Sequence, residues 1–349
     1  MDAKAVIADE EDFACLGYVG CLRYCLERRG EKRSQTFLMG VSGETFRLCY
    51  DRNDPERGLY VVFHNPVRAA CAALGYACEV IYHPQPQAAI DALGDLLAGG
   101  ERAILHAGDD WVVVEAHPSG PRQVRARYSD GRFETWSWPR LEQAWVKEPG
   151  LLELGLEGYY YLTIGARERE PEEREAAMGS LRRGVRMLLR RSRIDGCAAG
   201  LAAYEELLDS LTRKHANELH QARAVRKFAL WTAHPLAYVR GSRRAASHYL
   251  LAVQPHFDDE TKEHLRKASD FYQQTAQALA EVPAIDTPQE AAGNDRELTG
   301  AERKLIRALL PLRRRAARAL RRARKTEEQA LTEIRRALES AERQDKDVR

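Results

Sequence analysis

Three of the chain's seven cysteines lie within one short stretch, DFACLGYVGCLRYCLERRG, residues 12–30. Thiols this close together can bind a metal, form disulfides, pack as small apolar groups or provide a nucleophile. Structural zinc sites usually add a second ligand pair at short spacing, whereas Cys71 and Cys78 are seven residues apart. An odd number of cysteines without a signal-peptide pattern argues for reduced thiols. We therefore expect no metal, no cofactor and no disulfide framework.

Cys15 is the cysteine whose position provides a chemical mechanism. Asp12 is a suitable N-cap, and apolar residues recur at helical spacing behind it until Gly30, which predicts a helix. Cys15 falls in the first turn, where unpaired backbone amides and the helix dipole favour a thiolate. A nucleophile and a packed thiol are both compatible with this position. We interpret the other six as buried or half-buried packing residues: Cys21, Cys25, Cys49, Cys71, Cys78 and Cys197.

A second candidate for ligand binding is the segment GVSGETF, in which Gly40 and Gly43 flank Ser42. Glycines at this spacing let the backbone approach a ligand closely and present amide donors, so Ser42 and Gly43 are candidate substrate-binding residues. An ordinary loop that caps a helix is the alternative reading. The HEXXH, Walker and dinucleotide-binding motifs are absent from the sequence.

The elements that must position these residues follow from apolar periodicity. After two helical patterns, several short alternating runs with turn signals between them predict strands: RAILHA, DWVVVEAH, RQVRARY, RFETWSW and GYYYLTIG. A helix-led start followed by short strands is typical of an α+β domain with an antiparallel sheet. We place this domain at residues 1–168.

The composition changes at AREREPEERE, and residues 172–282 show helical periodicity, which predicts an all-α domain. A polar segment rich in Pro and Gly predicts a linker at 283–299, followed by one amphipathic basic helix at 300–344. From Ala301 to the end the chain has 16 basic and 8 acidic residues, and 11 of the basic ones fall between Arg303 and Lys325. We expect few contacts between this helix and the rest of the chain.

The first 282 residues also carry a family resemblance. A cysteine at the start of the first helix, a glycine fifteen residues later, MGVSGETFRL, and AALGY before a strand resemble the papain-like domain of the butirosin biosynthesis protein H family. That domain is similar to bacteriocin-processing cysteine peptidases. The helical region, with GLAAYEELLDSL and RGSRRAASHYLLAV, resembles the all-helical half that follows it in such proteins. The resemblance covers residues 10–282 and excludes the basic helix.

The resemblance implies an acyl-enzyme mechanism, in which a cysteine takes an acyl group from a thioester or amide and passes it to an amine or water. Cys15 matches the nucleophile position. The family's histidine usually opens the strand that resembles DWVVVEAH, where this chain has Asp110. We favour His106, at the end of the preceding strand, as the base. His117 and Asp110 are alternatives as base or substrate contact. The glutamine that usually precedes the cysteine is absent.

Two functions are compatible with these observations. The first is a cysteine-dependent acyltransferase or amide- or thioester-processing enzyme of specialised metabolism, acting on an acyl or peptide substrate that is free or attached to a carrier protein. The alternative is a catalytically inactive papain-like scaffold that binds a peptide, carrier protein or other partner. We expect a cytoplasmic protein without a membrane span. Residues 300–344 could pack on their own domain, self-associate or bind an acidic partner.

Overall fold

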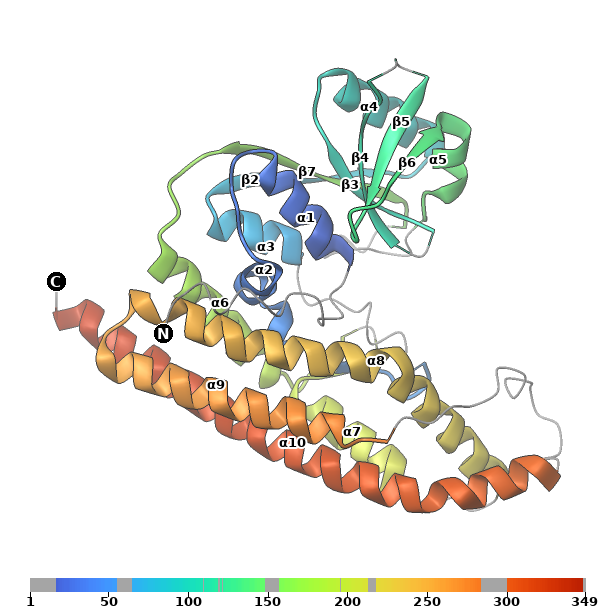
Figure 1. Ribbon diagram of the computed structural model, residues 1–349, viewed down its shortest axis with the longest axis vertical. Coiled ribbons are helices and arrows are strands. Elements are labelled where there is room, and N and C mark those ends of the chain that lie inside the picture. Colours follow the sequence, from blue (N-terminus) through green and yellow to red (C-terminus); the bar gives the residue numbers. More distant parts are fainter. Residues whose placement is uncertain are drawn as a thin grey trace. The chain divides into compact units, whose positions relative to one another are not determined.

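The computed structural model describes residues 17–54, 65–108, 110–118, 120, 122–147, 157–194, 196–212, 218–283 and 300–347. These residues fall into two compact units (Figure 1). Among the described residues, unit 1 comprises 17–42 and 65–179, and unit 2 comprises 43–54 and 180–347. The chain therefore enters unit 2 early, returns to unit 1, and then completes unit 2.

Unit 1 is an α+β unit built on a six-stranded antiparallel sheet with the strand order β2-β7-β3-β4-β5-β6. The predicted class and the antiparallel sheet are thus confirmed. Its elements in chain order are α1 (Gly17–Glu27), α2 (Gln35–Ser42), α3 (Pro66–Ala73), β2 (Tyr76–His83), α4 (Pro86–Ala98), β3 (Ala103–Ala107), β4 (Asp110–Ala116), β5 (Gln123–Tyr128), β6 (Phe133–Ser137), α5 (Trp138–Ala144), β7 (Tyr159–Arg167) and the first part of α6 (Glu173–Leu188).

Alternation along the strands divides the sheet of unit 1 into two faces. One face carries Leu105, Val112 and Val114, which pack with α4 and α5 in a buried apolar core. The opposite face carries His106 and Trp111, which are cross-strand partners, and helix α1 lies over it. The sheet thus places the sequence-predicted histidine on the face that carries the helix following Cys15.

Unit 2 is mainly helical. Its elements are the 3₁₀ turn η3 (Glu44–Phe46), β1 (Cys49–Tyr50), the rest of α6, β8 (Ala198–Ala199), α7 (Leu201–Thr212), α8 (Glu218–Val253), the 3₁₀ turn η5 (Gln254–His256), α9 (Asp259–Ala280) and α10 (Gly300–Asp347). Helices α8, α9 and α10 run side by side, and α7 packs against α10 (Figure 1). β1 pairs antiparallel with β8, which attaches residues 49–50 to this unit.

A buried ion pair joins the helices of unit 2. Nη2 of Arg243 on α8 lies 2.5 Å from Oε1 of Glu327 on α10, and both side chains are fully buried. Tyr204 on α7 donates its hydroxyl to the other oxygen of Glu327 at 2.7 Å. Nη1 of Arg243 donates to the backbone carbonyls of Thr45 and Arg47. One charge pair therefore connects three helices to the segment 44–47.

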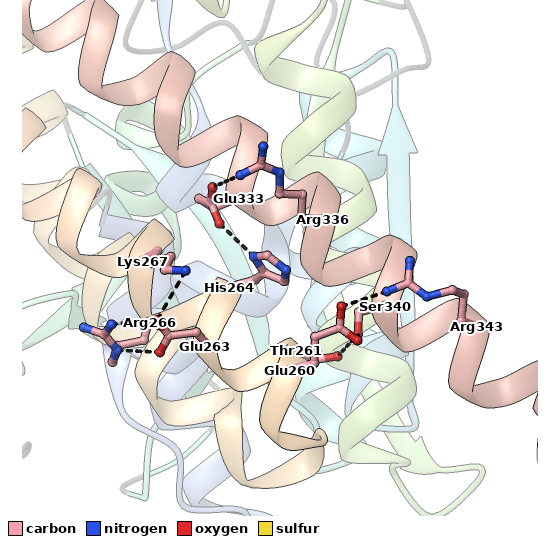
Figure 2. A network of polar contacts seen from close by, with 10 residues as sticks. All are labelled: Glu260, Thr261, Glu263, His264, Arg266, Lys267, Glu333, Arg336, Ser340 and Arg343. Atoms are coloured by element: carbon pink, nitrogen blue, oxygen red, sulfur yellow. Dashed lines mark hydrogen bonds and ion pairs between the residues drawn. The ribbon is translucent and has the colours of Figure 1, made fainter.

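A more exposed polar network joins α9 to α10 (Figure 2). Nδ1 of His264 lies 2.7 Å from Oε2 of Glu333, which also pairs with Arg336 at 2.5 Å. One turn nearer the start of α9, Thr261 donates to Ser340 and Glu260 pairs with Arg343 at 2.9 Å. These contacts fix the register of α10 along α9, so the helix is tied to its neighbour along much of its length.

The expectation that few contacts couple the basic helix to the rest of the chain is contradicted. The helix is present, as predicted, and runs from Gly300 through Pro311 to Asp347. Its apolar stripe, however, is buried inside unit 2: Ala316, Leu320, Ala323, Leu331, Ile334 and Leu338. The predicted domain ranges also differ from the observed units, because residues 43–54 belong to unit 2.

Replacing Glu327 by alanine tests the role of the buried pair. The change leaves the Arg243 guanidinium buried without its counter-charge, so we expect the free energy of unfolding of unit 2 to fall by about 3–5 kcal/mol. Urea unfolding followed by circular dichroism measures this loss. The matched control is Glu328→Ala, because this neighbouring carboxylate is exposed, and there we expect a change within about 0.5 kcal/mol. Equal losses in both variants would contradict the assignment.

Candidate functional site

The start of helix α1 packs closely on the sheet of unit 1. A Cβ at Gly17 would overlap Oδ1 of Asp110, and a Cβ at Gly20 would overlap the backbone carbonyl of Ser129. These two glycines lie one turn apart on the same face of α1. Without side chains, this face lets the start of β4 and the residue after β5 pack directly against the helix backbone. The close approach brings the first turn of α1 against Asp110.

Asp110 is held in place by two donors. Its Oδ1 accepts the backbone amide of Trp111 at 2.7 Å, and its Oδ2 accepts the hydroxyl of Ser129 at 3.2 Å. The first amides of a helix have no intrahelical acceptor and carry partial positive charge, so a carboxylate beside them is favourable. The position at which the resemblance expects a histidine is therefore occupied by a fixed, half-buried anion.

Cys15, the predicted nucleophile, lies outside the described residues, two positions before Gly17. His106, the predicted base, stacks on its cross-strand partner Trp111 with ring centroids 5.5 Å apart. Trp111 in turn meets the edge of Tyr18 in the first turn of α1, at 6.1 Å. The structure thus places His106 near the start of α1, while its role as a base stays a prediction.

The other predicted site residues lie elsewhere. His117 follows the far end of β4, and a seven-residue strand spans about 20 Å, so His117 is not brought to the start of α1. Its Nε2 lies 3.2 Å from Oγ1 of Thr135. Ser42 ends α2, is buried, and donates its hydroxyl to the carbonyl of Met39 at 2.9 Å. Gly43 has a φ of 90° and precedes η3. Ser42 and Gly43 thus have the geometry of a helix end.

The two cysteines within α1 behave as packing residues. Cys21 is buried and its Sγ lies 3.3 Å from the carbonyl oxygen of Trp111. Burial raises the pKa of the Cys25 thiol to about 12, so this thiol stays protonated at neutral pH. Within the described ranges, no group of three or more His, Cys, Asp or Glu side chains could hold a metal ion.

Sequence reasoning missed a surface of arginine and aromatic side chains beside α1. Phe133 on β6 is 39% exposed, and the guanidinium of Arg125 on β5 lies 3.7 Å from its ring centroid. Arg127 lies 4.2 Å from the ring centroid of Tyr24 on α1. The signal was present in RQVRARY and RFETWSW, because alternate residues of paired strands share one face. Only the observed register shows which residues meet.

Sequence reasoning also treated Cys71 and Cys78 as unrelated packing residues, but the interaction between their side chains raises the pKa of Cys71 and lowers that of Cys78. A helix, a glycine and a strand occur in succession between them, in the segment CAALGYAC. Such a reversal can bring the last turn of a helix against the start of the following strand. That pattern was the available signal, although it does not fix the distance between two side chains.

On α10, four of the exposed basic residues recur at spacings of three and four and form a stripe: Arg314, Arg318, Arg321 and Lys325. Packing of this helix on its own domain, one of the alternatives from the sequence, is thus observed. Binding of an acidic partner by the stripe stays a prediction, as does self-association. A search of the described helices finds none with the length and apolarity required to cross a membrane.

Comparison with models of known protein families and with curated proteins finds no match to this chain.

A Cβ at Gly17 would displace the carboxylate of Asp110, which two donors hold in place. We therefore expect Gly17→Ala to lower the free energy of unfolding of unit 1 by about 1–3 kcal/mol. Combining it with Asp110→Ala removes the obstructing oxygen, so the loss in the double variant should be smaller than the sum of the two single losses. Urea unfolding of all three variants provides the measurement.

Gly94→Ala in α4 is the matched control, because a Cβ there would meet its nearest atom, in Trp138, at an ordinary 3.8 Å. Removing a glycine from a helix interior stabilises it. If Gly17→Ala were as harmless as Gly94→Ala, the close packing of α1 on Asp110 would be refuted.

Proposed function

We propose that unit 1 is a papain-like scaffold that binds a partner and does not perform acyl transfer through Cys15. The observation that supports this proposal is the fixed carboxylate of Asp110 against the first turn of α1. In an acyl-enzyme site, the helix start stabilises a thiolate and a neutral imidazole accepts the thiol proton. In this chain an anion already occupies the helix start.

A carboxylate at this position opposes each charged species of the reaction. The nucleophile must become a thiolate, and the tetrahedral intermediate develops an oxyanion, so both carry the same sign as Asp110. Like charges repel more strongly near a protein surface than in bulk water, and each 1.4 kcal/mol of repulsion, roughly one pKa unit, corresponds to about a tenfold loss in rate. The Asp110 contact is therefore suited to a structural role.

The arginine and aromatic surface supports partner binding. Phe133 is exposed between Arg125 and Arg127, whose guanidinium groups lie over its ring. Exposed aromatic and arginine side chains are enriched where proteins bind one another. The guanidinium of Arg127 lies against the rings of Tyr24 and Phe133, and in this proposal the two arginines attract an acidic peptide or carrier protein.

The second candidate function is the cysteine acyltransferase. It is favoured by the location of His106 on the sheet face that carries α1, where it stacks on Trp111. An imidazole on this face is a candidate general base for a thiol that precedes the helix. In this alternative, Asp110 would orient the site rather than suppress it.

Asp110→Asn distinguishes the two functions, because it removes the charge and keeps groups able to bond Ser129. If the carboxylate suppresses the Cys15 thiolate, we expect alkylation of Cys15 by iodoacetamide at neutral pH to be about tenfold faster in Asp110→Asn, the effect of one pKa unit. Peptide mapping after limited labelling measures the rate. Asp130→Asn, which changes an exposed carboxylate paired with Arg132, should leave the rate unchanged.

A second experiment tests acyl transfer. The protein is incubated with a simple acyl thioester of N-acetylcysteamine, and its intact mass is measured. The scaffold proposal expects no acyl adduct on Cys15 above the level seen in Cys15→Ser. An adduct that forms in the wild-type protein and is lost in His106→Ala would overturn the proposal and establish the acyltransferase.

A further inference from the structure

The basic segment of α10, residues 313–325, presents only cations to solvent. Its buried side chains are mainly small and apolar, among them Ala316, Leu320 and Ala323. Every exposed side chain of this segment is basic: Arg314, Arg315, Arg318, Arg321, Arg322 and Lys325. The segment therefore has one face that packs inside unit 2 and one face that is entirely positive.

Four of these cations form the stripe of α10, which follows one line along the helix. Because successive residues of an α-helix are about 100° apart, the four members of the stripe fall within an arc of about 60°. From its first member to its last, the stripe spans about 16 Å. Helices α7 and α9 pack against α10 (Figure 1), so the stripe is displayed on a packed support.

The carboxylates close to this segment pair with other arginines. Glu281, which follows α9, pairs with Arg322, and Glu205 on α7 lies 2.6 Å from Arg324. Glu328 on α10 lies 3.7 Å from Arg324 as well. Within the described ranges, no ion pair involves a member of the stripe. The stripe is therefore a local concentration of positive charge in a chain whose net charge is only +2.

The chemistry of the exposed face narrows the class of partner. Guanidinium groups bind phosphate through paired hydrogen bonds, and three of the four stripe residues are arginines. The segment 313–325 exposes no apolar side chain that could enter a membrane interface. It also contains no aromatic residue that could stack on the bases of a single strand. A duplex, whose bases stack internally and whose phosphates face outward, fits this face.

We propose that the stripe binds the phosphate backbone of duplex DNA, a contact that carries no sequence information. One strand of the duplex has a phosphate per about 3.4 Å of its axis, so a stripe of about 16 Å places four cations opposite about five phosphates. Duplex RNA is recognised largely through 2′-hydroxyls, which donate and accept hydrogen bonds, whereas this face offers donors only. The function belongs to unit 2 and is independent of the scaffold role proposed for unit 1.

The test measures binding of the full chain to a short fluorescein-labelled DNA duplex by fluorescence anisotropy at several salt concentrations. Each phosphate contact contributes about −0.9 to the slope of log association constant against log salt concentration, so four contacts predict a slope of about −3.6. The stripe variant combines Arg314→Gln, Arg318→Gln, Arg321→Gln and Lys325→Gln. We expect it to bind about tenfold more weakly or worse, and to lose most of the slope. Duplexes of unrelated sequence should bind the wild-type protein equally.

The matched control changes four exposed cations at the other end of the same helix: Arg335→Gln, Arg336→Gln, Arg343→Gln and Lys346→Gln. This variant loses the same net charge, but its positions are interspersed with the exposed carboxylates of Glu339, Glu342 and Asp345. We therefore expect its affinity to stay within about twofold of the wild type. Equal weakening in both variants would report net charge alone and overturn the proposal. If the stripe variant fails to fold by circular dichroism, the wild-type slope decides, because a slope near zero contradicts phosphate binding.

Competition experiments decide the class of partner. Poly-glutamate should compete poorly with the labelled duplex, because a duplex has the higher charge density and releases condensed counterions when it is bound. Poly-glutamate that competes as well as unlabelled duplex DNA would assign the stripe to an acidic protein. An RNA duplex that competes better than the DNA duplex would assign it to RNA. Either result overturns the proposal.

Discussion

The buried ion pair between Arg243 and Glu327 is the constraint around which unit 2 is built. Two charges in a fully buried site cost less when they are paired with each other and bonded to further polar groups. Tyr204 supplies one such bond to Glu327, and the carbonyls of Thr45 and Arg47 supply others to Arg243. The requirement therefore fixes α7, α8, α10 and the segment 44–47 together. It also explains why a helix rich in exposed arginine belongs to the interior of this unit.

A different constraint organises the region of unit 1 that resembles an active site. Because Gly17 and Gly20 lack a Cβ, the sheet packs directly against the backbone of α1. Oδ1 of Asp110 occupies the space beside Gly17. Because Ser129 and the Trp111 amide hold that carboxylate, the charge at the helix start is fixed by the fold. The same face of the sheet continues to Arg127 and Phe133, which both contact Tyr24 of α1.

The pKa values of the described cysteine thiols differ because burial and neighbouring side chains differ from one thiol to the next. Cys25 and Cys49 are buried, and burial raises the pKa of each thiol to about 12. Cys78 is half-buried, and the interaction with the Cys71 side chain lowers the pKa of its thiol. Residues of one type thus differ in acidity because their surroundings differ.

The sequence by itself determined the local elements and the class of the fold. Alternation in DWVVVEAH and RQVRARY predicted β4 and β5, helical spacing predicted α9 and α10, and the succession of elements predicted an antiparallel sheet, because these patterns depend on neighbours a few residues apart. The tertiary structure alone decided that residues 43–54 join unit 2, that Glu327 meets Arg243, and that Asp110 reaches Gly17. Each of these contacts depends on the register and packing of whole elements, and the order of residues along a single element does not encode that information.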